Sequence, residues 1–173
     1  VSVGRNLELI ERFANQPYPR IRYDEAIERL KAKGVDVEWG EDLDYSKEKI
    51  LTQDFDVPHF LTHYPRIAKP FDHRPDPEDE KYVLCHDLLA PEGYREIIGG
   101  GESTWSEPEI LERIDEEGTP REPYEFYIDI HRYGGVPHGG FGLGLERVCA
   151  WLAGADHIRE VIPFPRDSRR VTP

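Results

Sequence analysis

The chain has 173 residues, of which 38% are hydrophobic and 33% charged, a composition typical of a folded domain. Its net charge of −13 argues against non-specific nucleic-acid binding, which needs lysine and arginine to displace counterions. No apolar run approaches the roughly 18 residues of a membrane helix, so we expect no membrane partner. With two cysteines, no disulfide framework and no visible signal peptide, we expect a cytoplasmic protein.

In the first half of the chain, DEAIERLKAK (24–33) has the apolar spacing of a helix. Asp24 is the expected N-cap of this helix, and Gly34 is its expected end. The next predicted elements are strands at 59–64 and 82–89, with a proline-broken charged loop at 72–80 between them.

In the second half, Ser106 and Glu109 form a predicted capping box ahead of a short helix that ends at Gly118. The segment 124–134 fits either a strand or a helix. A last helix covers 145–154, and its expected apolar stripe is Leu145, Val148, Cys149 and Leu152. Strands and helices mix without a βαβ rhythm, which favours an α+β fold with an antiparallel sheet flanked by helices.

The stretch PHGGFGLGLERV, residues 137–148, places glycine at 140, 142 and 144, between apolar residues. Because side chains alternate along a strand, these glycines share one nearly bare face, on which a flat ring can lie. Arg147 follows at the start of the last helix, and arginine matches phosphate oxygens. A ring and a phosphate together describe a nucleotide. Glycine spacing alone is equally compatible with a tightly packed strand and a solvated arginine.

Asp87 and Glu96 form a second group, separated by the turn APEGYR. Two carboxylates at the ends of facing segments suit Mg²⁺, a hard cation that takes one or two carboxylates and phosphate oxygens. Among 35 acidic residues, however, two carboxylates carry little weight by themselves.

PHGGFGLGLERV resembles motif 3 of the class II aminoacyl-tRNA synthetases, and the longer run RYGGVPHGGFGLGLERV…IREVIPFPR resembles their aspartyl and asparaginyl members, the asparaginyl ones most. HDLLAPEGYREIIGGG, HYPRIAKPF and YPRIRYDEAI continue the resemblance over nearly the whole chain. It implies a partial class II catalytic-domain fold, and it implies that 124–134 is a helix.

The resemblance also implies roles for individual residues. Adenine would lie near Gly142 and Gly144, with Arg147, the implied catalytic residue, on its other face or near the γ-phosphate. Mg²⁺ would bridge the ATP phosphates from Asp87 and Glu96. The implied ATP-binding residues are His138, Gly140, Gly142, Gly144 and Arg147, and the implied amino-acid-binding residues are Tyr64, Gly99 and Ser103.

The sequence departs from the family pattern in three ways. Ser103 stands where an arginine that reads the amino-acid side chain is expected, and His131 stands where relatives have arginine. Motifs 1 and 2 and an anticodon-binding domain are absent. We therefore expect residues 1–173 to be the C-terminal part of a catalytic domain, inactive alone, with an unpaired sheet edge and an apolar face. The missing half would lie upstream or on a partner chain, and the complete protein would be a homodimer.

Three functions remain open at this point. The first is an asparaginyl-type aminoacyl-tRNA ligase that forms an adenylate from ATP and asparagine or aspartate and uses tRNA through parts outside this chain. The second is a tRNA-independent asparagine synthetase that acts on aspartate. The third is a non-catalytic paralogue that binds nucleotide.

Overall fold

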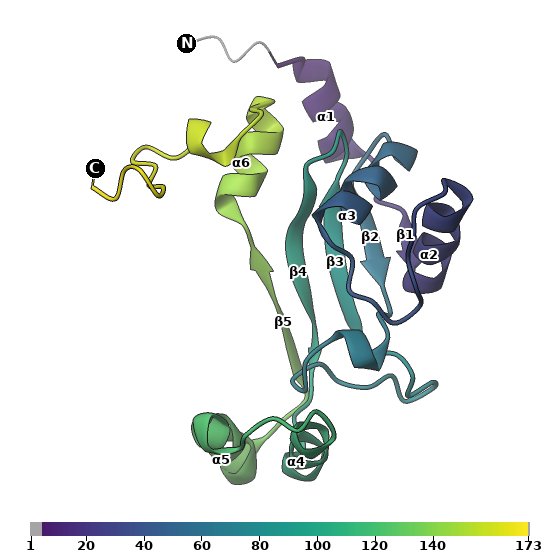
Figure 1. The fold of residues 1–173 in the computed structure, drawn as a ribbon, viewed down its shortest axis with the longest axis vertical. Coiled ribbons are helices and arrows are strands. Elements are labelled where there is room, and N and C mark those ends of the chain that lie inside the picture. Colours follow the sequence, from purple (N-terminus) through teal and green to yellow (C-terminus); the bar gives the residue numbers. More distant parts are fainter. Residues whose placement is uncertain (1–4, 173) are drawn as a thin grey trace.

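The computed structural model describes residues 5–172 as a five-stranded sheet with flanking helices (Figure 1). The strands are β1 (Arg20–Arg22), β2 (His59–Thr62), β3 (Cys85–Ala90), β4 (Arg95–Ser103) and β5 (His138–Leu143). The helices are α1 (Leu7–Asn15), α2 (Tyr23–Ala32), α3 (Tyr45–Leu51), α4 (Glu107–Glu116), α5 (Glu125–Gly134) and α6 (Leu145–Ala153). Short 3₁₀ helices are η1 (Thr52–Asp54), η2 (Arg66–Ala68), η3 (Glu122–Tyr124) and η4 (Ile158–Glu160).

The strands follow one another across the sheet in chain order, β1-β2-β3-β4-β5. All neighbouring pairs from β2 to β5 are antiparallel, whereas β1 pairs with β2 in parallel. The α+β prediction is confirmed, and the sheet is mixed rather than purely antiparallel because α2 and α3 carry the chain back between β1 and β2. Helix 124–134, predicted from the resemblance, is α5.

Each face of the sheet has its own apolar cluster. On one face, α2 and α3 cover β1 to β3 through residues that include Leu30, Leu51, Leu61 and Leu89. On the other face, α1 and α6 cover residues of β3 and β4 through a second cluster, in which the rings of Phe13 and Trp151 lie 5.0 Å apart.

The predicted apolar stripe of α6 is wrong. The residues that α6 buries are Ala150 and Trp151, whereas Leu145 and Leu152 are exposed. The reason is that α6 is anchored by contact with the distant helix α1, which its own periodicity does not reveal. The predicted end of this helix is confirmed, because Gly154 caps it with a left-handed conformation.

Two predicted helix caps are also wrong. The N-cap of α2 is Arg22, and Asp24 instead accepts hydrogen bonds from Trp39 Nε1 at 2.7 Å and the Tyr82 hydroxyl at 2.6 Å. Ser106 is the N-cap of α4, but its side chain makes no capping hydrogen bond. In the first case tertiary partners compete successfully for the carboxylate that would have capped the helix.

Helices α4 and α5 lie together at the far end of β4 and β5 (Figure 1), packed around Ile110, Ile114 and Ile128. β5 forms an edge of the described sheet, and all of its residues are exposed. An apolar surface continues onto α5 with Phe126, Ile130 and Tyr133. The expected sheet edge and apolar face are therefore present.

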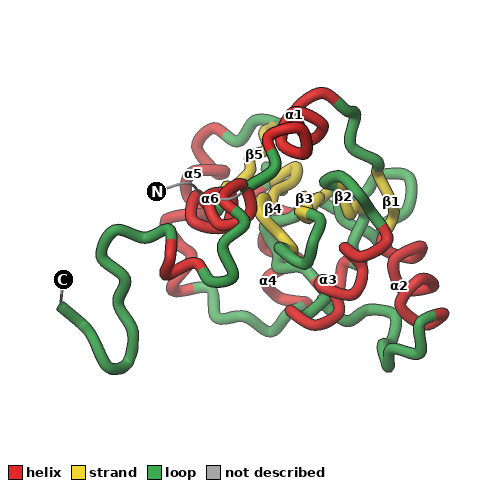
Figure 2. Tube along the Cα trace, turned by 90° about the horizontal axis from the view of Figure 1, so that it is seen from above, coloured by secondary structure: helices red, strands yellow, loops and turns green. Residues whose placement is uncertain are grey.

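After η4 the chain runs away from the sheet without regular structure as far as residue 172 (Figure 2). Among the described residues, no helix combines the length and the apolar character that crossing a membrane requires.

Candidate functional site

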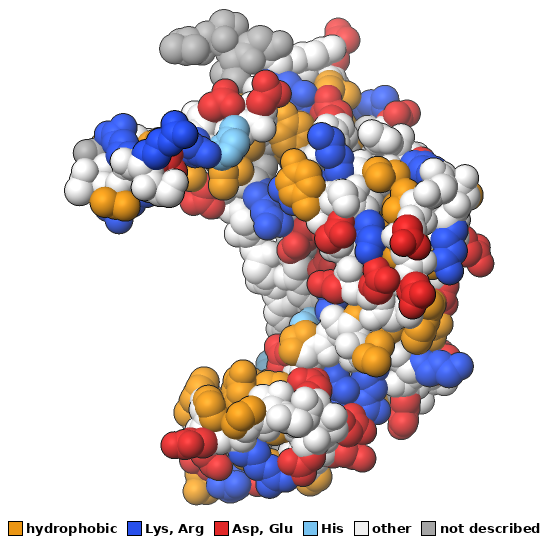
Figure 3. Space-filling view, in the orientation of Figure 1, with side chains coloured by type: hydrophobic (Ala, Val, Ile, Leu, Met, Phe, Trp, Pro, Cys, Tyr) orange, Lys and Arg blue, Asp and Glu red, His pale blue; other side chains and the backbone are white. Residues whose placement is uncertain are grey.

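A block of four glycines forms the floor of a cleft on the face of the sheet beside α3. In the antiparallel pairing of β4 and β5, Gly99 lies opposite Gly142 and Gly101 lies opposite Gly140. Opposite residues share a face, so these four positions together present bare backbone. The cleft has a volume of about 480 Å³, and Figure 3 shows its floor as a white hollow between the two ends of the molecule.

The glycines of this region fall into two kinds. A Cβ atom on Gly101 would lie 2.7 Å from the Leu84 carbonyl oxygen, so the fold itself requires glycine there. A Cβ atom on Gly140 would meet nothing within 4 Å, and one on Gly142 would meet only the Gly99 carbonyl oxygen at 4.0 Å. The fold does not explain glycine at 140 and 142, which leaves the space above them available to a ligand.

A β-bulge brings the two predicted metal-binding carboxylates to this floor. The register of β3 and β4 shifts between Leu88 and Leu89, so that Ile97 is an extra residue and Glu96 lies opposite Leu89. Glu96 thereby turns to the face that carries Asp87 and Gly99. A Cβ atom on Gly99 would lie 2.8 Å from Glu96 Oε1 and 3.2 Å from Asp87 Oδ1, so both carboxylates converge there.

The oxygen donors of Asp87 and Glu96 fit Mg²⁺, which takes one or two carboxylates and fills its other positions with phosphate or water. No group of three or more metal-binding side chains occurs among residues 5–172, so any such site would depend on this pair. Bound there, the metal would offset negative charge on the phosphates.

Each of the two carboxylates has a cationic neighbour. Lys69 Nζ lies 3.5 Å from Asp87 Oδ2, and Arg147 Nη1 lies 3.3 Å from Glu96 Oε2. Arg147 Nη1 also donates to the Glu96 carbonyl oxygen at 2.8 Å. Glu48 of α3 lies beneath the pair and accepts from the Glu96 N–H at 3.3 Å. Burial, with smaller contributions from Glu96 and Asp87, raises the Glu48 pKa to about 7.

The other predicted residues lie at the opposite end of the cleft or under it. His138 faces Ser103 across β4 and β5, four residues along from the Gly99–Gly142 pair, or about 13 Å. The structure thus places His138 beside the predicted amino-acid residue Ser103, away from Asp87 and Glu96. The buried His131 stacks on His138 with ring centroids 5.7 Å apart.

Tyr64 is only 1% exposed, so it supports the cleft from below and presents little surface to a ligand. Its pKa is raised well above the usual value by burial and by Asp87. The ring of Tyr64 carries Lys69 Nζ at 3.9 Å from its centroid. Lys69, which also lines the cleft, was not among the predicted site residues, although the run HYPRIAKPF that contains it resembled the family.

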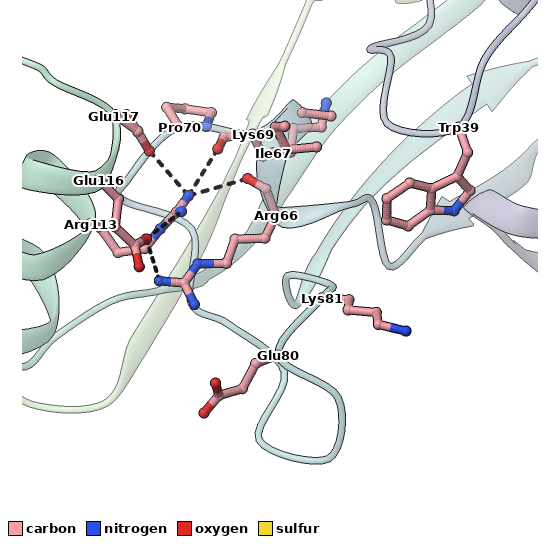
Figure 4. Close-up of a pocket in the computed structure, with 11 residues that line it drawn as sticks. Trp39, Arg66, Ile67, Lys69, Pro70, Glu80, Lys81, Arg113, Glu116 and Glu117 are labelled. Atoms are coloured by element: carbon pink, nitrogen blue, oxygen red, sulfur yellow. Dashed lines mark hydrogen bonds and ion pairs between the residues drawn. The ribbon is translucent and has the colours of Figure 1, made fainter.

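A second, larger cavity of about 800 Å³ lies behind the segment 66–70, around Arg113 of α4 (Figure 4). Its cations are already bonded within the protein. Arg113 donates to the carbonyl oxygens of Arg66 and Lys69 and pairs with Glu117 at 3.1 Å. Arg66 and Arg113 both pair with Glu116. This network fixes one wall of the cleft to α4, which accounts for its charges structurally.

Comparison with known proteins identifies the class. The family model for class II tRNA synthetases (D, K and N) matches residues 3–168, and the chain belongs to this family. The family and the partial class II fold predicted from motif 3 are therefore confirmed.

Among solved structures, asparaginyl-tRNA synthetase from Pyrococcus horikoshii is 48% identical, with a TM-score of 0.86, over 99% of this chain and 44% of that chain. The same enzyme has been solved with asparaginyl-adenylate. Asparaginyl-tRNA synthetase from Entamoeba histolytica is 34% identical, with a TM-score of 0.85, over 92% of this chain and 37% of that chain. Aspartyl-tRNA synthetase from the same organism is 31% identical, with a TM-score of 0.82, over 91% and 33%. The chain thus spans less than half the length of these relatives.

Proposed function

We propose that this chain forms part of an aminoacyl-tRNA ligase of the asparaginyl type, which activates its amino acid with ATP and transfers it to tRNA. The observation that carries the proposal is the open glycine floor, with Asp87, Glu96 and Arg147 at one end and Ser103 and His138 at the other. The similarity to an enzyme solved with asparaginyl-adenylate supports the same reading, because an adenylate joins an amino acid to a nucleotide.

The residues divide the work by position. Gly140 and Gly142 let the adenine ring rest against backbone, where van der Waals contact holds its plane. Arg147 supplies a fixed guanidinium beside the nucleotide, because its hydrogen bond to the Glu96 carbonyl oxygen orients it. Asp87 and Glu96 would hold Mg²⁺, which supplies charge stabilisation at the phosphates when bound.

Lys69 is the cation between the glycine floor and the segment 66–70. It lies 3.1 Å from Asp42 Oδ1 as well as near Asp87, and both carboxylates oppose the burial that would otherwise lower its pKa, leaving the pKa raised. Lys69 therefore stays protonated at neutral pH. It can hold a carbonyl or carboxylate oxygen of the amino acid, which fixes the substrate for attack on the α-phosphorus.

The amino-acid side chain is proposed to lie near Ser103, His138 and His73. The arginine expected at position 103 is missing, and Arg74, the guanidinium nearest in the chain, is engaged by Glu102. Asp72 and Glu102 also line this end of the cleft. Carboxylate-rich surroundings disfavour an aspartate side chain and suit an uncharged amide, which favours asparagine as the substrate.

The proposal is tested by incubating the full-length gene product with ATP, Mg²⁺, labelled asparagine and tRNA. Acid-precipitable asparaginyl-tRNA is the expected product. Free asparagine formed from aspartate and ammonia without tRNA would instead identify the synthetase alternative. Nucleotide binding without either product would identify the non-catalytic alternative.

A further inference from the structure

Three cations converge on a third cavity, which adjoins the metal-binding end of the glycine cleft. Lys49 of α3, Arg95 of β4 and Arg147 of α6 all line this cavity, whose volume is about 410 Å³. The pair between Arg147 and Glu96 stands between the cavity and the glycine floor, since Glu96 lines the cleft and Arg147 lines the cavity. In Figure 3 blue side chains border the hollow at this end.

Two of these cations have no carboxylate partner. In the part of the chain that the structure describes, neither Lys49 nor Arg95 forms an ion pair, although acidic residues outnumber basic ones by 35 to 22. Nearby Lys47, by contrast, is paired with Glu41. The acidic residues that line the cavity are Glu92 and Asp156, and Glu92 is already bonded to Arg5. Positive charge in the cavity is therefore in excess.

The cations are also held in place. The Arg95 guanidinium stacks over the Tyr45 ring, with Cζ 3.7 Å from the ring centroid. Arg95 has a φ of 65°, and its neighbour Glu92 a φ of 61°, conformations that non-glycine residues seldom adopt. The Lys49 stem lies along the same turn, because its Cε atom is 3.3 Å from where a Cβ of Gly93 would be. A strained turn thus directs two unpaired cations into one cavity.

We propose that this cavity binds a polyphosphate anion, in the form of the terminal phosphates of ATP or of the pyrophosphate that leaves when an amino acid is activated. The identity of the anion rests on the proposed function, whereas the existence of an anion site does not. Two guanidinium groups offer paired donors to phosphate oxygens, and Lys49 adds a point charge. The site would extend the nucleotide-binding surface beyond Arg147, on the side away from the amino acid.

The test is calorimetric titration of the full-length gene product with inorganic pyrophosphate, ATP and AMP in buffer that contains EDTA, so that Asp87 and Glu96 carry no metal. Lys49→Ala and Arg95→Asn remove one cation each, and asparagine tolerates the positive φ at position 95. Each should raise the pyrophosphate Kd about tenfold, the size expected for a lost charge-assisted hydrogen bond. Lys31→Ala, which removes an exposed cation of α2, is the matched control and should leave the Kd unchanged.

Loss of pyrophosphate and ATP affinity, with AMP unaffected, would place the terminal phosphates of bound ATP in the cavity. Loss of pyrophosphate affinity alone would assign it to the departing product. Unchanged pyrophosphate binding in Lys49→Ala and folded Arg95→Asn, or an equal loss in Lys31→Ala, would overturn the proposal. If the variants lose pyrophosphate but the wild-type protein activates no amino acid, the anion site stands and the proposed function fails.

Discussion

Replacement of Gly142 by valine tests whether the bare floor is kept for a ligand. A Cβ atom at this position would have only the Gly99 carbonyl oxygen near it, at 4.0 Å, so the side chain would stand in the open cleft. Valine also suits a strand better than glycine. We therefore expect Gly142→Val to fold and its free energy of unfolding to change by no more than about 1 kcal/mol.

The effect on ATP should be much larger. A Cβ atom projects about 1.5 Å from the backbone, so a ring that rests on the floor must move by a similar distance. Dispersion contacts weaken steeply over such a gap. Loss of about 1.4 to 2.7 kcal/mol of ring contact would weaken ATP binding about 10- to 100-fold.

Calorimetric titration of the full-length gene product with ATP measures this loss, and thermal unfolding reports whether the variant is folded. Gly134→Ala is the matched control, because a Cβ atom there also meets nothing within 4 Å but lies at the end of α5, outside the cleft lining. Unchanged ATP affinity in folded Gly142→Val, or an equal loss in Gly134→Ala, would refute the assignment of the floor.

Three further predictions follow from named contacts. Glu96→Gln should reduce Mg²⁺-dependent adenylate formation by about 10² to 10³, measured by single-turnover kinetics, and a wild-type rate would remove Glu96 from the site. Burial lowers the His59 pKa to about 4 from 6.5, so stability present above pH 6.5 should fall by up to about 3 kcal/mol as the pH drops to 4. Urea unfolding of His59→Phe should lack this component, and an identical pH profile would contradict it. Ile130→Glu should raise the monomer fraction of the 173-residue chain in sedimentation if its apolar face drives association, whereas no change would argue against that role.

The site could be predicted from the sequence where the signal is local. Alternating glycines at 140 and 142 specify a bare strand face, and the pairing with β4 adds Gly99 and Gly101 to it. The capping glycine of α6, Gly154, was also correct because a left-handed cap depends on nearby residues alone.

Features that depend on distant contacts could not be predicted in this way. The bulge at Ile97, which turns Glu96 toward Asp87, depends on how β3 and β4 pair. The burial of Trp151 depends on Phe13, more than a hundred residues earlier in the chain. Lys69 gained its place through Asp87, a contact that no periodicity encodes.

Segment 124–134 lies between these two cases. Its residues fitted a strand and a helix equally well, because Ile128 belongs to both patterns. Only the resemblance to a family decided for the helix α5, and the packing of Ile128 with α4 shows what stabilises it.

The most direct measurement of the account is ATP–pyrophosphate exchange by the full-length gene product, with asparagine and with aspartate. Exchange requires a bound amino acid, a bound nucleotide and the reverse reaction with pyrophosphate, so it reports on the whole cleft at once. We predict Mg²⁺-dependent exchange with asparagine, a much lower rate with aspartate, and no exchange by the 173-residue chain alone. Absence of exchange with either amino acid, or robust exchange by the isolated chain, would contradict the account.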